Sequence, residues 1–339
     1  MKIVVAHSNL GGLGGGERFV LEEVKHLSKR HDVKIVTWEY IEEDTLPGFK
    51  KYEIEELKSG SLPLKKLLTW ARYKGLADVF STHGFPSNFL SFRNRNTIWY
   101  CHILNLPFHN SYKPDYVVSR FFDRQAVKRT DKIVANSRFT QELIKRHYNR
   151  NSVVITPGVE PKEFKPGRCG DYVLLVSRIS PEKNIQLALD AMELVPDIKL
   201  IVVAGWVDRN YYKKLKFSSE RIELFEHVPE TKLRELYSNC LCVVQTATSE
   251  PFGMVPLEAM ASGKPVIAPK RGGFMETVTE ETGFLIEPTA EAMARKIDYL
   301  DKNRDIAKRM GKSGVKRARG FTWEKKMEAF ERVLTESGG

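Results

Sequence analysis

The chain begins with KIVVAHSNLGGLGGGERFVLEEVKHL, residues 2–27, which passes from a strand pattern through a glycine-rich turn into a helix pattern. The β-branched run Lys2–Ser8 is typical of a short buried strand. Apolar residues of helical spacing follow, at Phe19, Val20, Val24 and Leu27. A second apolar run, VKIVTW, completes a strand–helix–strand unit, and such units predict a parallel sheet.

The same alternation of short apolar runs and helical stretches recurs along the chain. In the first half the further predicted strands are DVFST, NTIWYCH, KIVANS and SVVITP. A segment rich in proline, glycine and charge, PGVEPKEFKPG, then reads as a linker. After it the predicted strands are DYVLLVS, IKLIVVAG, IELFEHV, LCVVQTA and KPVIAP, separated by helical stretches such as NIQLALDAMELV and TKLRELYSN. A chain of 339 residues is therefore expected to form two doubly wound α/β domains.

Composition and charge narrow the class of protein. No apolar run reaches the roughly 18 residues of a membrane span, and the first residues are too soon polar for a signal peptide, so a cytoplasmic protein is expected. The formal net charge is +11, and much of it lies in one late segment, at Lys302, Arg304, Lys308, Arg309, Lys312, Lys316, Arg317 and Arg319. Without interleaved aromatic residues this segment indicates a solvated helix face, and no nucleic-acid partner is expected.

The cysteines predict neither a metal site nor a disulfide framework. Their spacing, at Cys101, Cys169, Cys240 and Cys242, fits neither pattern. We expect all four to be reduced and buried, as free cysteines usually are.

Candidate binding residues follow the strands directly, where ligands bind in open parallel sheets. The turn GGLGGGER lets a ligand approach the backbone before a helix, which suits an anion, although a plain tight turn fits as well. Arg178 and Lys183, in SRISPEKN, are cations that together suit a diphosphate, but such exposed pairs are common. His102 ends an apolar strand and is either a structural histidine or one aimed at a ligand.

The fourth candidate loop is SEPFGMVPLEAMASGKPV, residues 249–266. Gly253 and Pro256 predict a turn into a helix over about 256–261, with Glu250 on the loop and Glu258 inside the helix. Carboxylates accept hydrogen bonds from hydroxyl groups, which favours a polyhydroxylated ligand. A pair of glycosidase carboxylates is the alternative, and it requires the two acids to flank one bond at a defined separation, which the sequence does not define.

These segments together resemble the retaining group 1 glycosyltransferases of family 4, which have the GT-B fold. The likeness runs nearly end to end: the GGxGGGER turn, His102, VANSRFTQELIKRHY, VITPGVEPKEF, SRISPEKN, the Glu250/Glu258 pair with EAMASGKPVIA, and GGFMETV with TGFLIEP. It implies two Rossmann-like doubly wound domains facing across a cleft. The expected domains are an acceptor-side domain over 1–160, a nucleotide-sugar donor domain over 161–320, and a last helix over 321–339 that crosses back to the first.

The resemblance also assigns roles to single residues. Arg178 and Lys183 match the pair that binds the donor diphosphate. Glu258 matches the glutamate on the ribose hydroxyls, Glu250 the one near the reacting carbon of the sugar, and His102 the histidine beside the transferred sugar. The backbone of Phe252, Gly253 and Met254 would touch the sugar and phosphate, and Gly15 and Gly16 would border the phosphates.

The activity implied is retaining sugar transfer from a nucleotide-sugar, without a metal or another cofactor. Attack from the front face, with the leaving phosphate taking the proton of the acceptor, is expected, and a covalent intermediate on Glu250 is the alternative. YCHILNLPFHN and GGGERFVLEEV look most like mannosyltransferases that extend lipid-linked or polysaccharide-linked glycans, which favours GDP-mannose over UDP-sugars. A nucleotide-sugar epimerase or phosphorylase on a similar scaffold, and a binding protein that has lost catalysis, are competing hypotheses.

Residues 61–80 bear on contact with a membrane. Apolar and basic residues alternate there, at Leu64, Leu67, Leu68 and Trp70 and at Lys65, Lys66, Arg72 and Lys74. This pattern predicts either a helix at the interface of an anionic membrane, peripheral on its cytoplasmic face, or an ordinary helix packed on its own sheet.

Overall fold

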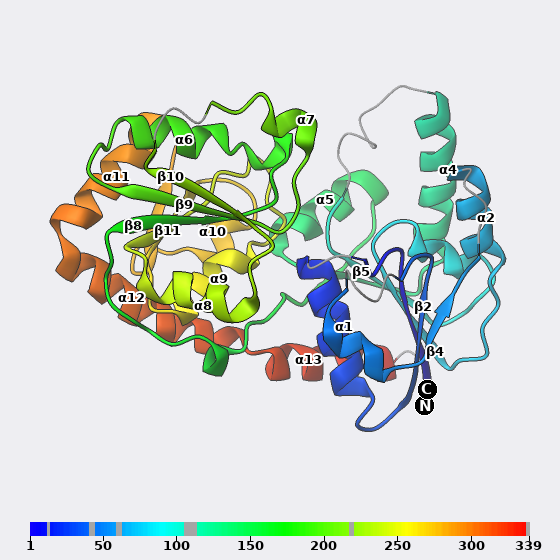
Figure 1. Ribbon diagram of the computed structural model, residues 1–339. Coiled ribbons are helices and arrows are strands. Elements are labelled where there is room, and N and C mark those ends of the chain that lie inside the picture. The colour runs from blue at the N-terminus through cyan, green and yellow to red at the C-terminus, as the bar shows by residue number, and fades with distance from the viewer. Residues whose placement is uncertain (12–13, 41–44, 59–62, 105–113, 217–219, 337–339) are drawn as a thin grey trace. The chain divides into compact units, whose positions relative to one another are not determined.

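The computed structural model describes residues 1–339 apart from 12–13, 41–44, 59–62, 105–113, 217–219 and 337–339. The chain divides into two compact units (Figure 1). The first unit comprises Met1–Pro157 and Glu324–Gly339, and the second comprises Gly158–Trp323. Each unit is built on its own parallel sheet.

The first unit has a seven-stranded sheet in the order β3-β2-β1-β4-β5-β6-β7, with every pair parallel. The strands are β1 (Lys2–His7), β2 (Asp32–Thr37), β3 (Ile54–Glu56), β4 (Val79–His83), β5 (Thr97–Cys101), β6 (Lys132–Ala135) and β7 (Val153–Val154). The order reverses between β1 and β4, which is the topological switch point of this sheet.

Helices of the first unit pack on this sheet (Figure 1). They are α1 (Gly15–Leu27), α2 (Pro63–Arg72), α4 (Pro114–Arg129), α5 (Arg138–Tyr148) and α13 (Trp323–Thr335). Although α13 is the last helix of the chain, it packs in this unit, where Phe330 lies 5.6 Å from Phe19 between ring centroids and 5.5 Å from Tyr100.

The second unit has a six-stranded parallel sheet in the order β10-β9-β8-β11-β12-β13. Its strands are β8 (Tyr172–Val176), β9 (Lys199–Ala204), β10 (Ile222–Glu226), β11 (Cys242–Val244), β12 (Val266–Pro269) and β13 (Gly283–Ile286). Its helices are α6 (Gln186–Glu193), α7 (Arg209–Tyr212), α8 (Glu230–Asn239), α9 (Met254–Ala261), α10 (Phe274–Thr277), α11 (Ala290–Lys302) and α12 (Arg304–Ala318).

Both faces of the second sheet are covered, as the apolar strands predict. Val173 and Leu175 of β8 point into one buried cluster, and Leu174 between them points into the other. The α/β class with two doubly wound sheets is therefore confirmed. Two edge strands, β3 and β13, are absent from the sequence prediction.

Helix α2 uses its apolar face within its own unit. Trp70 is fully buried, and Leu67 packs against the same cluster as Phe80 and Leu90. Leu68, at 40% exposed, is the exception among its described apolar side chains. The helix thus matches the ordinary packed helix better than a helix whose apolar face is free for a membrane.

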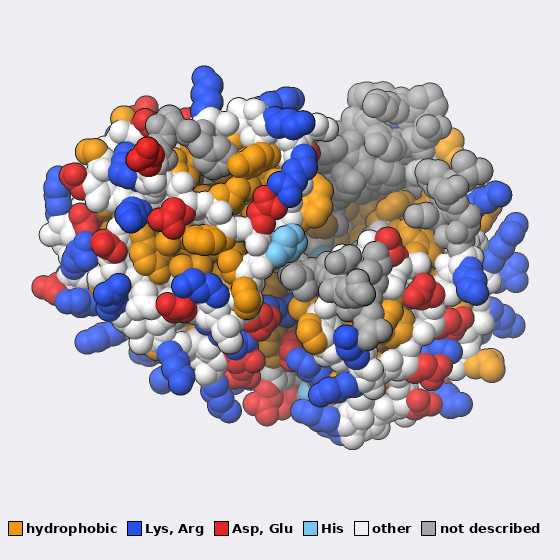
Figure 2. All heavy atoms as spheres, viewed as in Figure 1, with side chains coloured by type: hydrophobic (Ala, Val, Ile, Leu, Met, Phe, Trp, Pro, Cys, Tyr) orange, Lys and Arg blue, Asp and Glu red, His pale blue; other side chains and the backbone are white. Residues whose placement is uncertain are grey.

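The basic segment of α11 and α12 divides into solvated and structural residues. Lys302, Lys308, Arg309, Lys312, Lys316 and Arg319 are exposed, as a solvated face predicts. Arg304 and Arg317 are not: Arg304 donates to the carbonyl oxygens of Cys169 and Gly170, and Arg317 donates to those of Glu276 and Thr277. Figure 2 shows Lys and Arg side chains interspersed with acidic ones on the visible face.

The cysteine prediction is right for three residues and wrong for one. Cys101, Cys240 and Cys242 are free and fully buried, whereas Cys169 is free but partly exposed. Burial raises the pKa of the Cys240 thiol to about 12, and it also raises that of Cys101. Cys101 packs with Ile133 and Leu104, away from the ring of the adjacent His102.

Candidate active site

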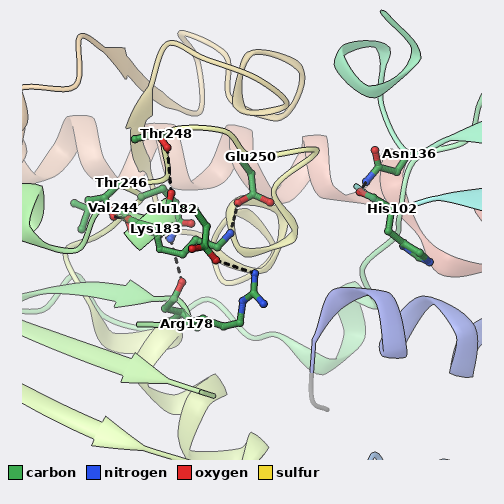
Figure 3. A network of polar contacts seen from close by, with 11 residues as sticks. His102, Asn136, Arg178, Glu182, Lys183, Val244, Thr246, Thr248 and Glu250 are labelled. Atoms are coloured by element: carbon green, nitrogen blue, oxygen red, sulfur yellow. Dashed lines mark hydrogen bonds and ion pairs between the residues drawn. The ribbon is translucent and has the colours of Figure 1, made fainter. Parts of the chain in front are cut away.

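An ion pair whose side chains are mostly buried lies at the switch point of the second sheet, between β8 and β11. Lys183 lies in the loop after β8, at the end of a 3-10 turn that begins at Pro181, and Glu250 lies in the loop after β11. Their side chains meet at 2.7 Å between Nζ and Oε2, with 18% and 16% of each side chain exposed (Figure 3). Two loops separated by 67 residues in sequence are thus joined by one strong polar contact.

Two threonines after β11 fix the backbone that carries Lys183. Thr246 Oγ1 donates to the carbonyl oxygen of Lys183 at 2.6 Å. The backbone N–H of Thr248 donates to the carbonyl oxygen of Glu182 at 3.2 Å (Figure 3). Neither residue was predicted, although Thr246 and Thr248 lie at the end of the predicted strand LCVVQTA and directly after it, where ligand-binding side chains are expected.

Arg178 is held much more loosely than Lys183. Its side chain is 54% exposed, and its Nη2 lies 3.4 Å from Glu182 Oε1. An exposed contact of this length contributes little to stability, so the guanidinium can reorient toward an anion at small cost. The structure therefore brings Lys183 to Glu250 and leaves Arg178 on the neighbouring turn.

The loop of Glu250 depends on two glycines that approach it from another segment. The N–H of Gly273 donates to the carbonyl oxygen of Glu250 at 2.7 Å. A side chain on Gly273 would overlap the backbone of Phe252, and one on Gly272, whose φ is +55°, would press on the carbonyl of Glu250. GGFMETV contains these glycines, and sequence alone does not indicate which loop they touch.

Helix α9 begins directly after this loop. It starts at Met254, two residues before the predicted start, with Gly253 as its N-cap in the left-handed region at φ +93° and no capping side chain. Phe252 is buried beneath the turn. Glu250 lies on the loop and Glu258 in the helix, as predicted.

Glu258 lies in a different environment from Glu250. It is only 8% exposed, and Tyr237 of α8 donates its hydroxyl to Glu258 Oε2 at 2.7 Å. The buried tyrosine hydroxyl orients the carboxyl group of Glu258. Tyr237 is a third residue of this site that the sequence patterns did not indicate.

In the first unit, His102 follows β5 and lies among other aromatic rings. Its backbone carbonyl accepts from Asn136 Nδ2 at 2.6 Å, and its Nε2 lies 3.1 Å from His83 Nδ1. The surrounding protein holds the pKa of His102 well below its ordinary value, and the neighbouring His83 and His7 lower it further. The ring is therefore neutral at neutral pH.

The glycine turn of the first unit approaches the same histidine. Helix α1 starts at Gly15, with Gly14 as its N-cap. A β-carbon on Gly16 would lie 3.5 Å from His7 Nε2 and 3.8 Å from His102 Cγ, so this turn passes close over both rings. The N-terminus of α1 and His102 are thus neighbours within one unit.

Neither a metal cluster nor a membrane span is found in the part of the chain that the structure describes. No group of three or more His, Cys, Asp or Glu side chains among the described residues could hold a metal ion. None of the described helices has both the length and the apolar character to cross a membrane.

Two family models match this fold and these loops. One, described as Glycosyltransferase Family 4, matches residues 13–163, and the other, Glycosyl transferases group 1, matches residues 161–317. Together they span nearly the whole chain. The protein belongs to the group 1, family 4 glycosyltransferases and is an enzyme of the transferase class.

Similar proteins agree with this assignment. An uncharacterized glycosyltransferase of Methanocaldococcus jannaschii is 27% identical over 99% of this chain and 98% of its own length. The alpha-1,3/1,6-mannosyltransferase of Neurospora crassa is 26% identical over 83% of this chain and 68% of its own. The solved structure of sucrose-phosphate synthase from Thermosynechococcus elongatus, 20% identical, superposes with a TM-score of 0.84 over 99% of this chain and 98% of its own. The predicted GT-B fold is confirmed.

Proposed function

We propose that this protein is a retaining glycosyltransferase that moves mannose from GDP-mannose to a glycan or lipid-linked acceptor without a metal. The Lys183–Glu250 contact at the switch point of the second sheet carries the proposal, because it places a fixed cation beside a carboxylate where a nucleotide-sugar donor would bind. The choice of mannose is supported by relatives named alpha-1,3/1,6-mannosyltransferases.

Lys183 and Arg178 would stabilise the departing nucleoside diphosphate. As the anomeric bond breaks, negative charge grows on the phosphate, and a positioned lysine and a mobile guanidinium both favour that charge. The start of α9, at Gly253 and Met254, has no capping side chain, and its backbone N–H groups add partial positive charge that also favours the phosphate.

Glu258 and Glu250 would recognise the two sugars of the donor. Glu258, oriented by Tyr237, suits the hydroxyls of the ribose, and Glu250 suits the transferred sugar. In the first unit, His102 would contact the transferred sugar, and Gly15 and Gly16 would let phosphate approach the start of α1.

Retention would follow from attack on the face that the leaving group occupies. A bond forms between the acceptor oxygen and the anomeric carbon, the bond from that carbon to the phosphate oxygen breaks, and the acceptor proton passes to the leaving diphosphate. The alternative with a covalent intermediate on Glu250 differs by a second displacement. Trapping of a sugar ester on Glu250, read by mass spectrometry, would favour that alternative.

A donor screen tests the proposal most directly. GDP is expected to raise the melting temperature more than UDP or ADP, and GDP-mannose is expected to support transfer with the α-configuration retained, read by NMR of the product. A protein that responds to none of these nucleotides would instead be a binding protein without catalysis. Conversion of the donor to its epimer without transfer would identify an epimerase.

Use of a UDP-sugar is the second candidate. It is supported by the solved structure of Anabaena HepE in complex with UDP-glucose, which is 20% identical and superposes with a TM-score of 0.83. A larger thermal shift with UDP than with GDP, together with transfer from UDP-glucose, would establish this candidate over mannose transfer.

Contact with an anionic membrane would bring the enzyme to a lipid-linked acceptor. Two adjacent pairs of apolar side chains are exposed on α4, Val117 with Val118 and Phe121 with Phe122. Exposed cations share that helix, at Arg124, Lys128 and Arg129. This mixture suits an interfacial helix better than α2 does. Co-sedimentation with phosphatidylglycerol vesicles should fall in the double variant Phe121→Ser/Phe122→Ser and with added salt, and an unchanged bound fraction would exclude α4 as the contact.

A further inference from the structure

A buried chain of polar side chains lies behind His102 in the first unit. It begins at Glu23 of α1, continues through His83 at the end of β4, and ends at His102 after β5. Glu23 Oε2 lies 2.6 Å from His83 Nε2, and both side chains are completely buried. His83 Nδ1 in turn lies 3.1 Å from His102 Nε2.

His83 Nδ1 is thus within hydrogen-bond distance of His102, and His83 Nε2 faces two groups, the Ser81 hydroxyl at 3.1 Å and the Glu23 carboxyl group at 2.6 Å. A neutral imidazole has one N–H and one lone pair, so the group at one nitrogen decides what the other nitrogen offers. His102 is partly exposed, and its Nε2 faces His83. Its Nδ1 is then the ring nitrogen that can meet a ligand.

We propose that Glu23 and His83 are positioning residues that fix the tautomer of His102, so that His102 offers a hydrogen-bond donor at Nδ1 to an oxygen of the bound nucleotide-sugar. The inference deepens the proposed function and rests on it for the identity of the ligand. The proton arrangement itself does not depend on the proposed function, because Glu23, His83 and His102 all lie in the first unit.

The arrangement follows from the state of Glu23. A protonated Glu23 donates to His83 Nε2, so His83 carries its proton on Nδ1 and donates to His102 Nε2. His102 must then carry its own proton on Nδ1. When Glu23 loses its proton to solvent, His83 donates from Nε2, its Nδ1 accepts from His102 Nε2, and His102 Nδ1 becomes an acceptor. One proton leaves the cluster, and both imidazoles change tautomer.

The surroundings of Glu23 favour the protonated acid. Burial raises the pKa of Glu23 to about 8, against smaller opposing effects of the Ser81 hydroxyl and of His7. Burial also holds the pKa of His83 well below its ordinary value and lowers that of His7. The imidazoles around the acid are thus neutral at neutral pH and do not ionise it.

The remaining groups around the cluster come from each element packed on it. Ser81 Oγ of β4 lies 3.1 Å from His83 Nε2 and can donate to the acid or to the ring. Tyr100 of β5 lies 4.7 Å from the ring of His102 between centroids, and burial raises its pKa, so it stays neutral. Glu17 of α1 acts on His7 by its charge, and α13 contributes the apolar ring of Phe330.

The decisive experiment records the imidazole ¹⁵N resonances of the whole protein between pH 6 and pH 10. His102, assigned by loss of its signals in His102→Asn, is expected to hold its proton on Nδ1 at pH 7 and to change tautomer near pH 8. This readout needs no enzymatic activity. A proton on Nε2 of His102 at pH 7, or a tautomer that is constant across this range, would overturn the proposal.

The Glu23→Gln variant separates positioning from packing. Its amide can still donate to His83 but cannot ionise, so His102 should keep its proton on Nδ1 up to pH 10. In transfer assays the wild-type kcat should fall about tenfold between pH 7 and pH 9, as expected if Glu23 titrates near pH 8. In the variant, kcat at pH 7 and kcat at pH 9 should be nearly equal. Glu22→Gln, which changes the neighbouring glutamate paired with Lys25, is the matched control and should titrate like the wild type.

Equal alkaline losses of activity in wild type and Glu23→Gln would also contradict the proposal. A protein without transfer activity that nevertheless shows the change of tautomer would leave the positioning chain standing and remove the proposed function. The two failures are therefore distinguishable.

Discussion

The two sheets share the same order over six strands, the first having one further edge strand, β7, but their switch points carry different side chains. In the second unit the switch between β8 and β11 is lined by charge, with Lys183 against Glu250 and both partly exposed. In the first unit the switch between β1 and β4 is lined by His7 and His83, which are buried and neutral. Topology thus decides where polar groups collect, and the side chains that follow each strand decide whether they act as charges or as neutral hydrogen-bonding groups.

Removal of the lysine should have the largest effect, because it deletes the fixed charge of the second switch point. Lys183→Ala is expected to lower kcat/KM by about 10²–10³-fold, as loss of one preorganised donor to a developing oxyanion does. The rate of sugar transfer measures it, with Lys199→Ala, an exposed lysine of the same unit, as the control. Wild-type turnover in Lys183→Ala would contradict the diphosphate role.

The second largest effect is expected from a side chain added at Gly273, where the loop approaches the backbone near Glu250. Gly273→Ala adds a methyl group that overlaps the backbone of Phe252, and we expect a loss of about 1–3 kcal/mol in the free energy of unfolding. Urea titration measures this loss. Gly205→Ala, in the same unit and with no atom near the added methyl, should be nearly neutral, and equal effects of the two changes would show that the contact does not strain the loop.

The buried acid of α9 should matter for nucleotide binding more than for the chemical step. Glu258→Gln is expected to weaken binding of the nucleoside diphosphate about tenfold, since a charged acceptor becomes a neutral one. Calorimetry with GDP or UDP measures the change. Tyr237→Phe, which removes only the orienting hydroxyl, should have a smaller effect in the same direction, and unchanged affinity in both would place the ribose elsewhere.

The smallest effect concerns the docking of α13 in the first unit. Glu331 accepts from His26 Nε2 at 2.8 Å and from His31 Nε2 at 2.9 Å. Burial alone would raise the pKa of Glu331, but these hydrogen bonds outweigh it and hold the pKa below its ordinary value. The carboxylate therefore stabilises the fold above the pKa it has in the unfolded chain, and this contribution is lost as pH falls through the lower, folded pKa.

Glu331→Gln should accordingly cost about 1 kcal/mol of unfolding free energy at pH 7 and progressively less below about pH 4. Denaturant titration at several pH values checks it. The control is Glu336→Gln, directly after the same helix, whose side chain is 68% exposed and contacts Lys132 at 3.2 Å. A loss for Glu331→Gln that stays constant with pH would assign the effect to packing instead.

Much of the secondary structure could be predicted, because strand and helix patterns are local. The strand within Lys2–Ser8 and the strand before His102 appear where their apolar runs predict them, and the helix that Gly253 and Pro256 predict begins two residues early, at Met254. The edge strands β3 and β13 were not predicted, because charged residues surround the first and only four apolar or glycine residues, GFLI, form the second. The partial exposure of Cys169 was not predicted either, because burial depends on which distant segments pack over a residue.

The amino-acid sequence by itself determined that polar residues follow buried strands in each half, at His102, Arg178, Lys183 and Glu250. Only the tertiary structure decided their partners: Glu250 for Lys183, Tyr237 for Glu258, and the chain from Glu23 through His83 for His102. The reason is physical. Periodicity is read over a few residues, whereas parallel strands bring together loops that are tens of residues apart, and burial among them sets the charge of each group.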